Sequence, residues 1–266
     1  MNVVNQTGKL RIDRQHMSYE LDDGPGYRAR IGVIVLATDH SLEYEFRRML
    51  NIPGVAFYES RIPNSTAVTK EALTAMAASM TQAADLILPG VELDVIAYGC
   101  TSASMFIGFE RIHAEIRKVR PGVACTTPME AVFAALKTLN AKRICFIAPY
   151  SDDINRSMRA FLQDYGFEVP VMGSWNLTDD NTVARISPQS IREAILELGS
   201  SATVDAVFLA CTSLRLADDV ETLERELGKP VTSSNHALAW HCLRLAGIDD
   251  AVAGYGRLFR SGLNPD

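Results

Sequence analysis

Two cysteines of this 266-residue sequence share one local pattern, because each is followed by a threonine and a serine. The two motifs are Cys100-Thr101-Ser102 and Cys211-Thr212-Ser213. A thiol removes a proton from carbon only if part of it ionises near neutral pH, and a free cysteine has a pKa of about 8.5. A turn from strand to helix lowers that pKa, and residues 99–104 and 210–215 fit such turns. Hydroxyl and backbone N–H groups beside each thiol can hold a carboxylate or an enediolate.

The pairing of the two motifs indicates acid/base chemistry at one carbon. Inversion of a carbon centre needs one group that removes a proton and a second group that returns a proton from the opposite face. A lone cysteine at the end of an apolar strand is more often structural than catalytic. Two cysteines with matching neighbours favour catalysis by Cys100 and Cys211. The other three cysteines, which lack this symmetry, are interpreted as core or helix-face residues: Cys125, Cys145 and Cys242.

Short apolar runs alternate with amphipathic stretches along the chain, which predicts an α/β fold with parallel strands joined by helices. The runs occupy residues 30–37, 93–99, 143–149 and 204–210. One connecting helix is expected over 188–198, because Ser187 can cap its start and Pro188 suits its first position. Gly199 then follows the last apolar residue of that helix.

The strands belong to a weak internal repeat. Residues 93–102 match 204–213, and residues 30–39 match 143–152 at nearly the same offset. Ligands of open parallel sheets bind beyond the carboxyl ends of the strands, so both Cys-Thr-Ser loops should lie at the functional edge of their half. If the halves face each other about a pseudo-two-fold axis, the two sulfurs meet across one cleft.

The repeat predicts three parts of the chain. Residues 1–27 form an N-terminal arm, residues 28–124 plus 236–266 form the first α/β domain, and residues 125–235 form the second. In this arrangement a helix around 236–246 crosses back to pack on the first half.

Three more residues follow the first strand of a half and therefore share the edge with the cysteines. Tyr150 is expected to hydrogen-bond a substrate carboxylate, and Thr38 and Asp39 are expected to contact substrate. An ionised Asp39 would favour a cationic or hydroxyl group and penalise a second carboxylate, by about 4 kcal/mol at about 4 Å. The alternative is that Asp39 only caps the helix beginning near His40.

Composition excludes several classes of partner. The chain has 26 basic and 32 acidic residues, a net charge of −6, and no basic run that could follow nucleic acid or an anionic membrane. Five cysteines without a disulfide framework predict a reducing cytoplasm, and the first 27 residues lack the apolar core of a signal peptide. The scattered histidines form no metal-ligand set. A homo-oligomer is left open.

Several segments together resemble the aspartate/glutamate racemase superfamily, and within it the branch of maleate cis-trans isomerases and arylmalonate decarboxylases. They are YGCTSAS, APYSDDINRSMRAFL, ACTSL, LERELGKPVTSSNHALAW and GYGRLF. The resemblance covers about residues 30–260. It implies two Rossmann-like domains related by a pseudo-two-fold axis, an active site between them for a small carboxylic acid, and neither metal nor organic cofactor.

Position by position, the resemblance implies that Cys100 and Cys211 are the two catalytic cysteines. It places the carboxylate-binding and oxyanion groups at Thr101, Ser102, Tyr150, Thr212 and Ser213. The decarboxylases have glycine where this chain has Cys100. Keeping both sulfurs therefore favours racemisation or isomerisation over decarboxylation.

The first strand departs from the maleate isomerase pattern. Where those enzymes have a Pro-Ser-Ser-Asn-like turn, this chain has Leu36-Ala37-Thr38-Asp39. The segment VIVLATDHSLEYEFRRML most resembles the racemase-like ectoine-utilisation protein A group. We therefore expect a racemase or epimerase of a small acid, linked by resemblance to ectoine or hydroxyectoine breakdown. The alternatives are a maleate-type isomerase acting through a covalent cysteine adduct, an arylmalonate-type decarboxylase, and a small-acid binding protein.

Overall fold

Two parallel sheets of four strands form the framework of the protein. A computed structural model describes residues 14–65 and 69–264. The first sheet has the strand order β2-β1-β3-β4 and the second has β6-β5-β7-β8. The strands of the first sheet are β1 (Ala29–Leu36), β2 (Val55–Ile62), β3 (Val95–Gly99) and β4 (Ala124–Thr126). Those of the second sheet are β5 (Arg143–Ala148), β6 (Glu168–Ser174), β7 (Ala206–Leu209) and β8 (Val231–Ser233). The predicted α/β fold is confirmed, and the equal strand order of the two sheets matches the sequence repeat.

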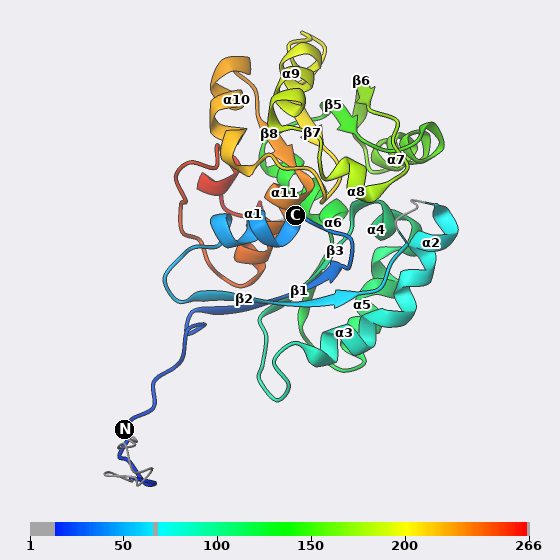
Figure 1. Cartoon of the computed structure of the whole chain (residues 1–266). Helices are drawn as coiled ribbons and strands as arrows, with labels where there is room; N and C mark the ends of the chain where they lie inside the picture. Colours follow the sequence, from blue (N-terminus) through cyan, green and yellow to red (C-terminus); the bar gives the residue numbers. More distant parts are fainter. Residues whose placement is uncertain (1–13, 66–68, 265–266) are drawn as a thin grey trace, which may run out of the picture.

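Helices connect successive strands and cover the sheets (Figure 1). In the first half they are α1 (Leu42–Met49), α2 (Lys70–Ala75), α3 (Met80–Leu86), α4 (Thr101–Ile107), α5 (Phe109–Arg117) and α6 (Pro128–Thr138). In the second half they are α7 (Asp152–Asp164), α8 (Asp180–Val183), α9 (Pro188–Gly199), α10 (Val220–Leu227) and α11 (Ser234–Leu245). Short 3-10 segments lie at Met76–Ser79, Ala217–Asp219 and Leu258–Arg260. The helix predicted over 188–198 is confirmed as α9, whose N-cap Ser187 accepts a hydrogen bond from the N–H of Ser190.

Side chains of β1 alternate between two hydrophobic cores, as the two-residue period of a strand requires. Ile31, Val33 and Val35 belong to a core that continues through the second sheet. Ile34 and Leu36 face a separate core beneath the other helices of the first half. Because both faces of the sheet are covered, the strand is apolar at nearly every position.

Helix α11 lies between the two sheets, packed against α1, α6 and β3 (Figure 1). Its residues from Ser234 to Arg244 are all buried. A helix buried all round needs no polar face, and its sequence accordingly lacks a strong amphipathic pattern. The N-terminus of α11 is capped by Ser233. It lies beside the carboxyl ends of β3 and β7, because Ser234 hydrogen-bonds to Thr101 and to Cys211.

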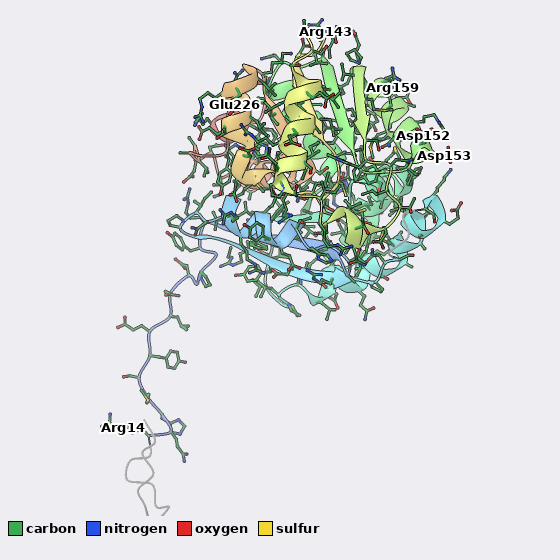
Figure 2. All side chains as sticks on the ribbon, turned by 45° about the horizontal axis from the view of Figure 1, so that its top comes forward. Arg14, Arg143, Asp152, Asp153, Arg159 and Glu226 are labelled. Carbon is green, nitrogen blue, oxygen red and sulfur yellow. The ribbon has the colours of Figure 1, made fainter. Side chains whose placement is uncertain are left out.

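The N-terminal part of the expected arm extends from the body of the protein (Figure 1). Residues 14–23 are exposed, form no helix or strand, and extend away from the sheets (Figure 1). Residues 1–13 of that arm lie outside the described residues. Figure 2 shows Arg14 on the arm, and Arg143, Asp152 and Glu226 projecting from the far surface of the second half. In the part of the chain that the structure describes, no helix is long and apolar enough to cross a membrane.

Candidate active site

One cavity collects both Cys-Thr-Ser motifs. The cavity is partly enclosed and opens to solvent at one side. The lining residues come from both halves of the chain and include apolar side chains of β1 and α2. They are Leu36, Asn64, Ser65, Ala72, Leu73, Met76, Cys100, Thr101, Ser102, Tyr150, Asp180, Cys211, Thr212 and Ser213. Seven of the nine residues singled out from the sequence line this cavity, and Thr38 and Asp39 do not.

Cys100 is held at the junction of β3 and α4. It is the N-cap residue of α4 with an extended backbone, and its side chain is buried. The preceding Gly99 packs tightly, since a Cβ there would lie 2.5 Å from Leu42 Cδ1. The hydroxyl of Ser102 lies 3.9 Å from the Cys100 sulfur. The expected strand-to-helix turn at residues 99–104 is confirmed.

Cys211 has a different backbone from its repeat partner. Its φ angle of 111° lies in a region that residues other than glycine rarely adopt. Residues 212–213 form a turn, and the next helical segment begins only at Ala217. The expectation that residues 210–215 turn directly into a helix is therefore wrong, because the positive φ redirects the chain after β7. Unlike Cys100, Cys211 is not itself the N-cap residue of a following helix.

Burial controls the ionisation of both thiols. It raises the pKa of Cys100 to about 12, although the N–H of Ala103 and the hydroxyl of Ser102 oppose it. Burial also raises the pKa of Cys211, opposed by the N–H of Ser213 and the hydroxyl of Tyr150. The expectation that these loops lower the thiol pKa is corrected, because desolvation outweighs the local donors. Burial therefore favours the neutral thiol at both positions.

Tyr150 follows β5 and is buried in the cavity wall. Its hydroxyl interacts with Cys211 and with Thr101, and thus with both cysteine loops. Burial raises the pKa of this phenol well above its ordinary value, so it remains a neutral hydrogen-bonding group. The geometry suits a donor to a ligand oxygen.

Ser234, at the start of α11, joins the two cysteine loops. Its hydroxyl accepts a hydrogen bond of 2.8 Å from Thr101 Oγ1 and one of 3.1 Å from the N–H of Cys211. Ser41 adds a second link between the halves, since its hydroxyl donates to the carbonyl of Ser213 over 2.8 Å. The relative position of the two sulfurs is thus fixed by buried hydrogen bonds.

Asp39 caps a helix and lies outside the cavity lining. Its Oδ1 accepts hydrogen bonds from the N–H groups of Ser41 at 2.7 Å and Leu42 at 2.8 Å, at the start of α1. Burial raises the pKa of this carboxyl. The structure therefore places Asp39 where the helix-capping interpretation put it, and Thr38 beside it contacts Asp180.

Asp180 is the charged cavity residue that the sequence reasoning missed. It begins α8, and its carboxylate accepts hydrogen bonds from Thr38 Oγ1 and, at 2.8 Å, from Ser213 Oγ. Asn64, after β2, lines the cavity as well and donates to Thr38 Oγ1 over 2.7 Å. The only sequence signal for Asp180 was its place after β6, at the same edge as the other strand ends.

The remaining cysteines are not among the residues that line this cavity. Cys145 and Cys242 are buried and Cys125 is partly buried, and all three are free thiols. Among the residues that the structure describes, no group of three or more His, Cys, Asp or Glu side chains is placed to hold a metal ion.

The sequence is similar to proteins of known function. The family model for arylmalonate decarboxylase matches residues 53–259. This chain belongs to the arylmalonate decarboxylase family. The arylmalonate decarboxylase of Bordetella bronchiseptica is 31% identical over 62% of this chain and 70% of its own length. The maleate isomerase of Pseudomonas putida is 27% identical over 86% of this chain and 96% of its own length.

Solved structures agree with this assignment. The maleate cis-trans isomerase of Nocardia farcinica superposes with a TM-score of 0.78 at 27% identity, covering 87% of this chain and 98% of that protein. A liganded arylmalonate decarboxylase double mutant gives a TM-score of 0.76 at 28% identity, with 87% and 98% covered. The predicted fold and the resemblance to this branch are confirmed. Membership of the ectoine-utilisation group remains a prediction.

Proposed function

We propose that this protein is an isomerase that inverts a carbon centre next to the carboxylate of a small acid. The observation that carries the proposal is that Cys100 and Cys211 line one cavity. They follow β3 and β7, which occupy equivalent positions in the two sheets. Two thiols on opposite sides of one carbon can remove a proton from one face and return a proton to the other.

The proposed reaction needs one thiol and one thiolate. As the acid enters, one cysteine loses its proton to water while the other keeps its own. The thiolate takes the proton from the carbon next to the carboxylate, and the electron pair of that bond moves into the carboxylate to form an enediolate. The opposite thiol then gives its proton to the second face and becomes the thiolate, so protons and charge balance.

The hydroxyl groups of the cavity fit the carboxylate and the enediolate. Thr101 and Ser102 follow one sulfur, Thr212 and Ser213 follow the other, and Tyr150 contacts both loops. Donors that already point into the cavity stabilise developing negative charge without reorganisation. No lysine or arginine is among the described residues that line the cavity.

The names of the relatives support a second candidate more directly. Four of the curated relatives are maleate isomerases, and one solved relative is a cysteine-to-serine mutant with a covalently bound succinylcysteine intermediate. In that reaction the thiolate of Cys100 or Cys211 would add to one alkene carbon while the other thiol protonates the neighbouring carbon. After rotation about the new single bond, the second cysteine, now a thiolate, would take that proton back as the first sulfur leaves, which gives the trans acid and restores one thiol and one thiolate.

The finer substrate proposal rests on residues 33–50, which resemble the ectoine-utilisation group. We infer that the acid carries nitrogen or hydroxyl and arises in the breakdown of ectoine or hydroxyectoine. Such an acid has a chiral centre beside its carboxylate and lacks the double bond that a maleate-type reaction requires.

Product analysis separates these candidates. The wild-type protein is incubated in deuterium oxide with maleate and, separately, with single enantiomers of 2-amino and 2-hydroxy acids, including those derived from hydroxyectoine. Inversion yields the opposite enantiomer with deuterium at the inverted carbon, whereas maleate-type isomerisation yields fumarate. Fumarate formation without inversion of any chiral acid would replace our proposal by the second candidate, and carbon dioxide release from an arylmalonate would indicate decarboxylation.

A further inference from the structure

A single charged side chain faces the cavity among its described lining residues. Asp180 contributes this charge, and its residue is 8% exposed. The described ion pairs of the protein do not include it. A buried carboxylate without a cation is unfavourable, and a ligand of opposite charge would relieve that cost.

The hydrogen bonds around Asp180 fix it as an acceptor. Asn64 Nδ2 donates to Thr38 Oγ1, so the hydroxyl proton of Thr38 points to Asp180 Oδ2. Ser213 Oγ donates to Asp180 Oδ1 over 2.8 Å. A carboxylate has about four lone-pair positions, and two protein donors leave about two for a ligand. The ligand group that meets Asp180 must therefore be a donor.

Asp180 also interacts electrostatically with both cysteines. Its negative charge raises the pKa of Cys100 and of Cys211. A cation bound beside Asp180 would offset that effect on both sulfurs at once. The same ligand group would thus be recognised by the carboxylate and would favour the thiolate that proton transfer needs.

We propose that Asp180 is a specificity-determining residue that selects monocarboxylates bearing a protonated nitrogen on the reacting carbon or one carbon away. This proposal rests on the proposed function, because it assumes that the reacting carbon lies between Cys100 and Cys211. The substrate carboxylate is held by the hydroxyl groups of the cysteine loops, and the protonated nitrogen occupies the free acceptor positions of Asp180. A dicarboxylate such as maleate would place a second negative charge in the same buried cavity.

Two sets of matched ligands test the selection in wild-type protein. Alanine, lactate and methylmalonate differ in one substituent on the carbon next to the carboxylate, which is ammonium, hydroxyl or carboxylate. The acids 2,3-diaminopropionate, serine and aspartate repeat the comparison one carbon away. Binding is measured by calorimetry and by the shift of the thermal unfolding midpoint. We expect the ammonium member of at least one set to bind about tenfold to a hundredfold more tightly than its carboxylate member.

The Asp180→Asn variant tests whether this residue causes the preference. It keeps the side-chain shape and removes the charge, so the ammonium ligand should weaken by about tenfold or more and the dicarboxylate should bind more tightly. Asp179→Asn is the matched control, because it removes one charge from the same short helix outside the cavity and retains a good capping residue. It should preserve the wild-type preference.

The outcomes separate this proposal from the proposed function. Equal binding of ammonium and carboxylate members to wild type, binding of none of the ammonium acids, or an unchanged preference in Asp180→Asn would overturn the selection by Asp180. If Asp180 only holds Thr38 and Ser213 in place, Asp180→Asn should lower the unfolding midpoint and leave the ligand preference unchanged. If Asp180→Asn does not fold, the wild-type ligand ratios alone decide the outcome. Charge selection without inversion in deuterium oxide would instead defeat the proposed function.

Discussion

Thr101, directly after the first cysteine, donates a hydrogen bond of 2.8 Å to Ser234 at the start of α11. Because Ser234 also accepts the N–H of Cys211, one buried hydroxyl aligns the loops that carry both sulfurs. The two cysteines are thereby positioned by a residue that contributes no group to the cavity lining. Ser234 is a positioning residue in our account.

Replacing Ser234 by alanine should lower turnover more than its effect on stability explains. The variant leaves a buried N–H and a buried hydroxyl without their acceptor, which costs about 1–3 kcal/mol. Ser187→Ala removes the N-cap of the distant helix α9 at a cost of about 1 kcal/mol. Both variants should show lower unfolding midpoints, and only Ser234→Ala should reduce the rate of deuterium exchange into substrate. Equal exchange rates would contradict the positioning role.

The strand ends were predictable because apolar runs and a repeat specify which loops share an edge. Cys100, Cys211 and Tyr150 each follow a strand of the repeat, and the structure brings all three to one cavity. Asp180 was not predictable in the same way. It lies in a short helix after β6, and its approach to Thr38 depends on how the two halves pack.

Relative to alanine, glycine should raise stability at Cys211 and lower it at Cys100. Cys211 has a φ of 111°, where a Cβ costs about 1 kcal/mol or more, so Cys211→Gly should be more stable than Cys211→Ala by about 1 kcal/mol. Cys100 has an extended backbone with a φ of −149°, so Cys100→Gly should be less stable than Cys100→Ala. Urea unfolding of the four variants gives both differences. Lower stability of Cys211→Gly than of Cys211→Ala would show that Cys211 is unstrained.

The backbone at Cys211 also shows why local sequence was insufficient. The Thr-Ser pair begins a helix in the first half and forms a turn in the second. The difference depends on contacts such as that between the N–H of Cys211 and Ser234, which lies 23 residues later. Identical local residues therefore adopt different conformations under different tertiary contacts.

Glu45 should make stability fall as pH rises towards neutrality. Its carboxylate in α1 accepts hydrogen bonds from the N–H groups of Leu216 and Ala217 and from Asn235, and burial raises its pKa from 4.5 to about 7. Between these values the folded protein binds more protons than the unfolded chain. The free energy of unfolding should therefore decrease by about 3 kcal/mol across this interval.

Glu45→Gln should abolish that part of the pH dependence, because glutamine does not titrate. Urea unfolding at about pH 5 and about pH 8 measures the difference for each protein. The control Glu43→Gln removes a partly exposed carboxylate from the same helix and should retain the wild-type dependence. An unchanged slope in Glu45→Gln would show that another group is responsible.

Tyr150→Phe should slow alkylation of Cys211 and spare Cys100. The Tyr150 hydroxyl lowers the pKa of the Cys211 thiol, so its removal raises that pKa and reduces the thiolate fraction several-fold. The groups that oppose burial at Cys100 are instead Ala103 and Ser102. Peptide mapping after timed iodoacetamide treatment reports each cysteine separately. Equal slowing at both positions would indicate a general closure of the cavity.

Proton exchange in deuterium oxide with single-cysteine variants tests the paired action of Cys100 and Cys211 most directly. A single enantiomer of an acid that the wild type inverts is incubated with wild type, Cys100→Ala and Cys211→Ala, and the reaction is followed by NMR and chiral analysis. We predict that the wild type forms deuterated opposite enantiomer and that neither variant inverts the centre, while one variant still exchanges the proton on its remaining face. Inversion at the wild-type rate in either variant would contradict the account.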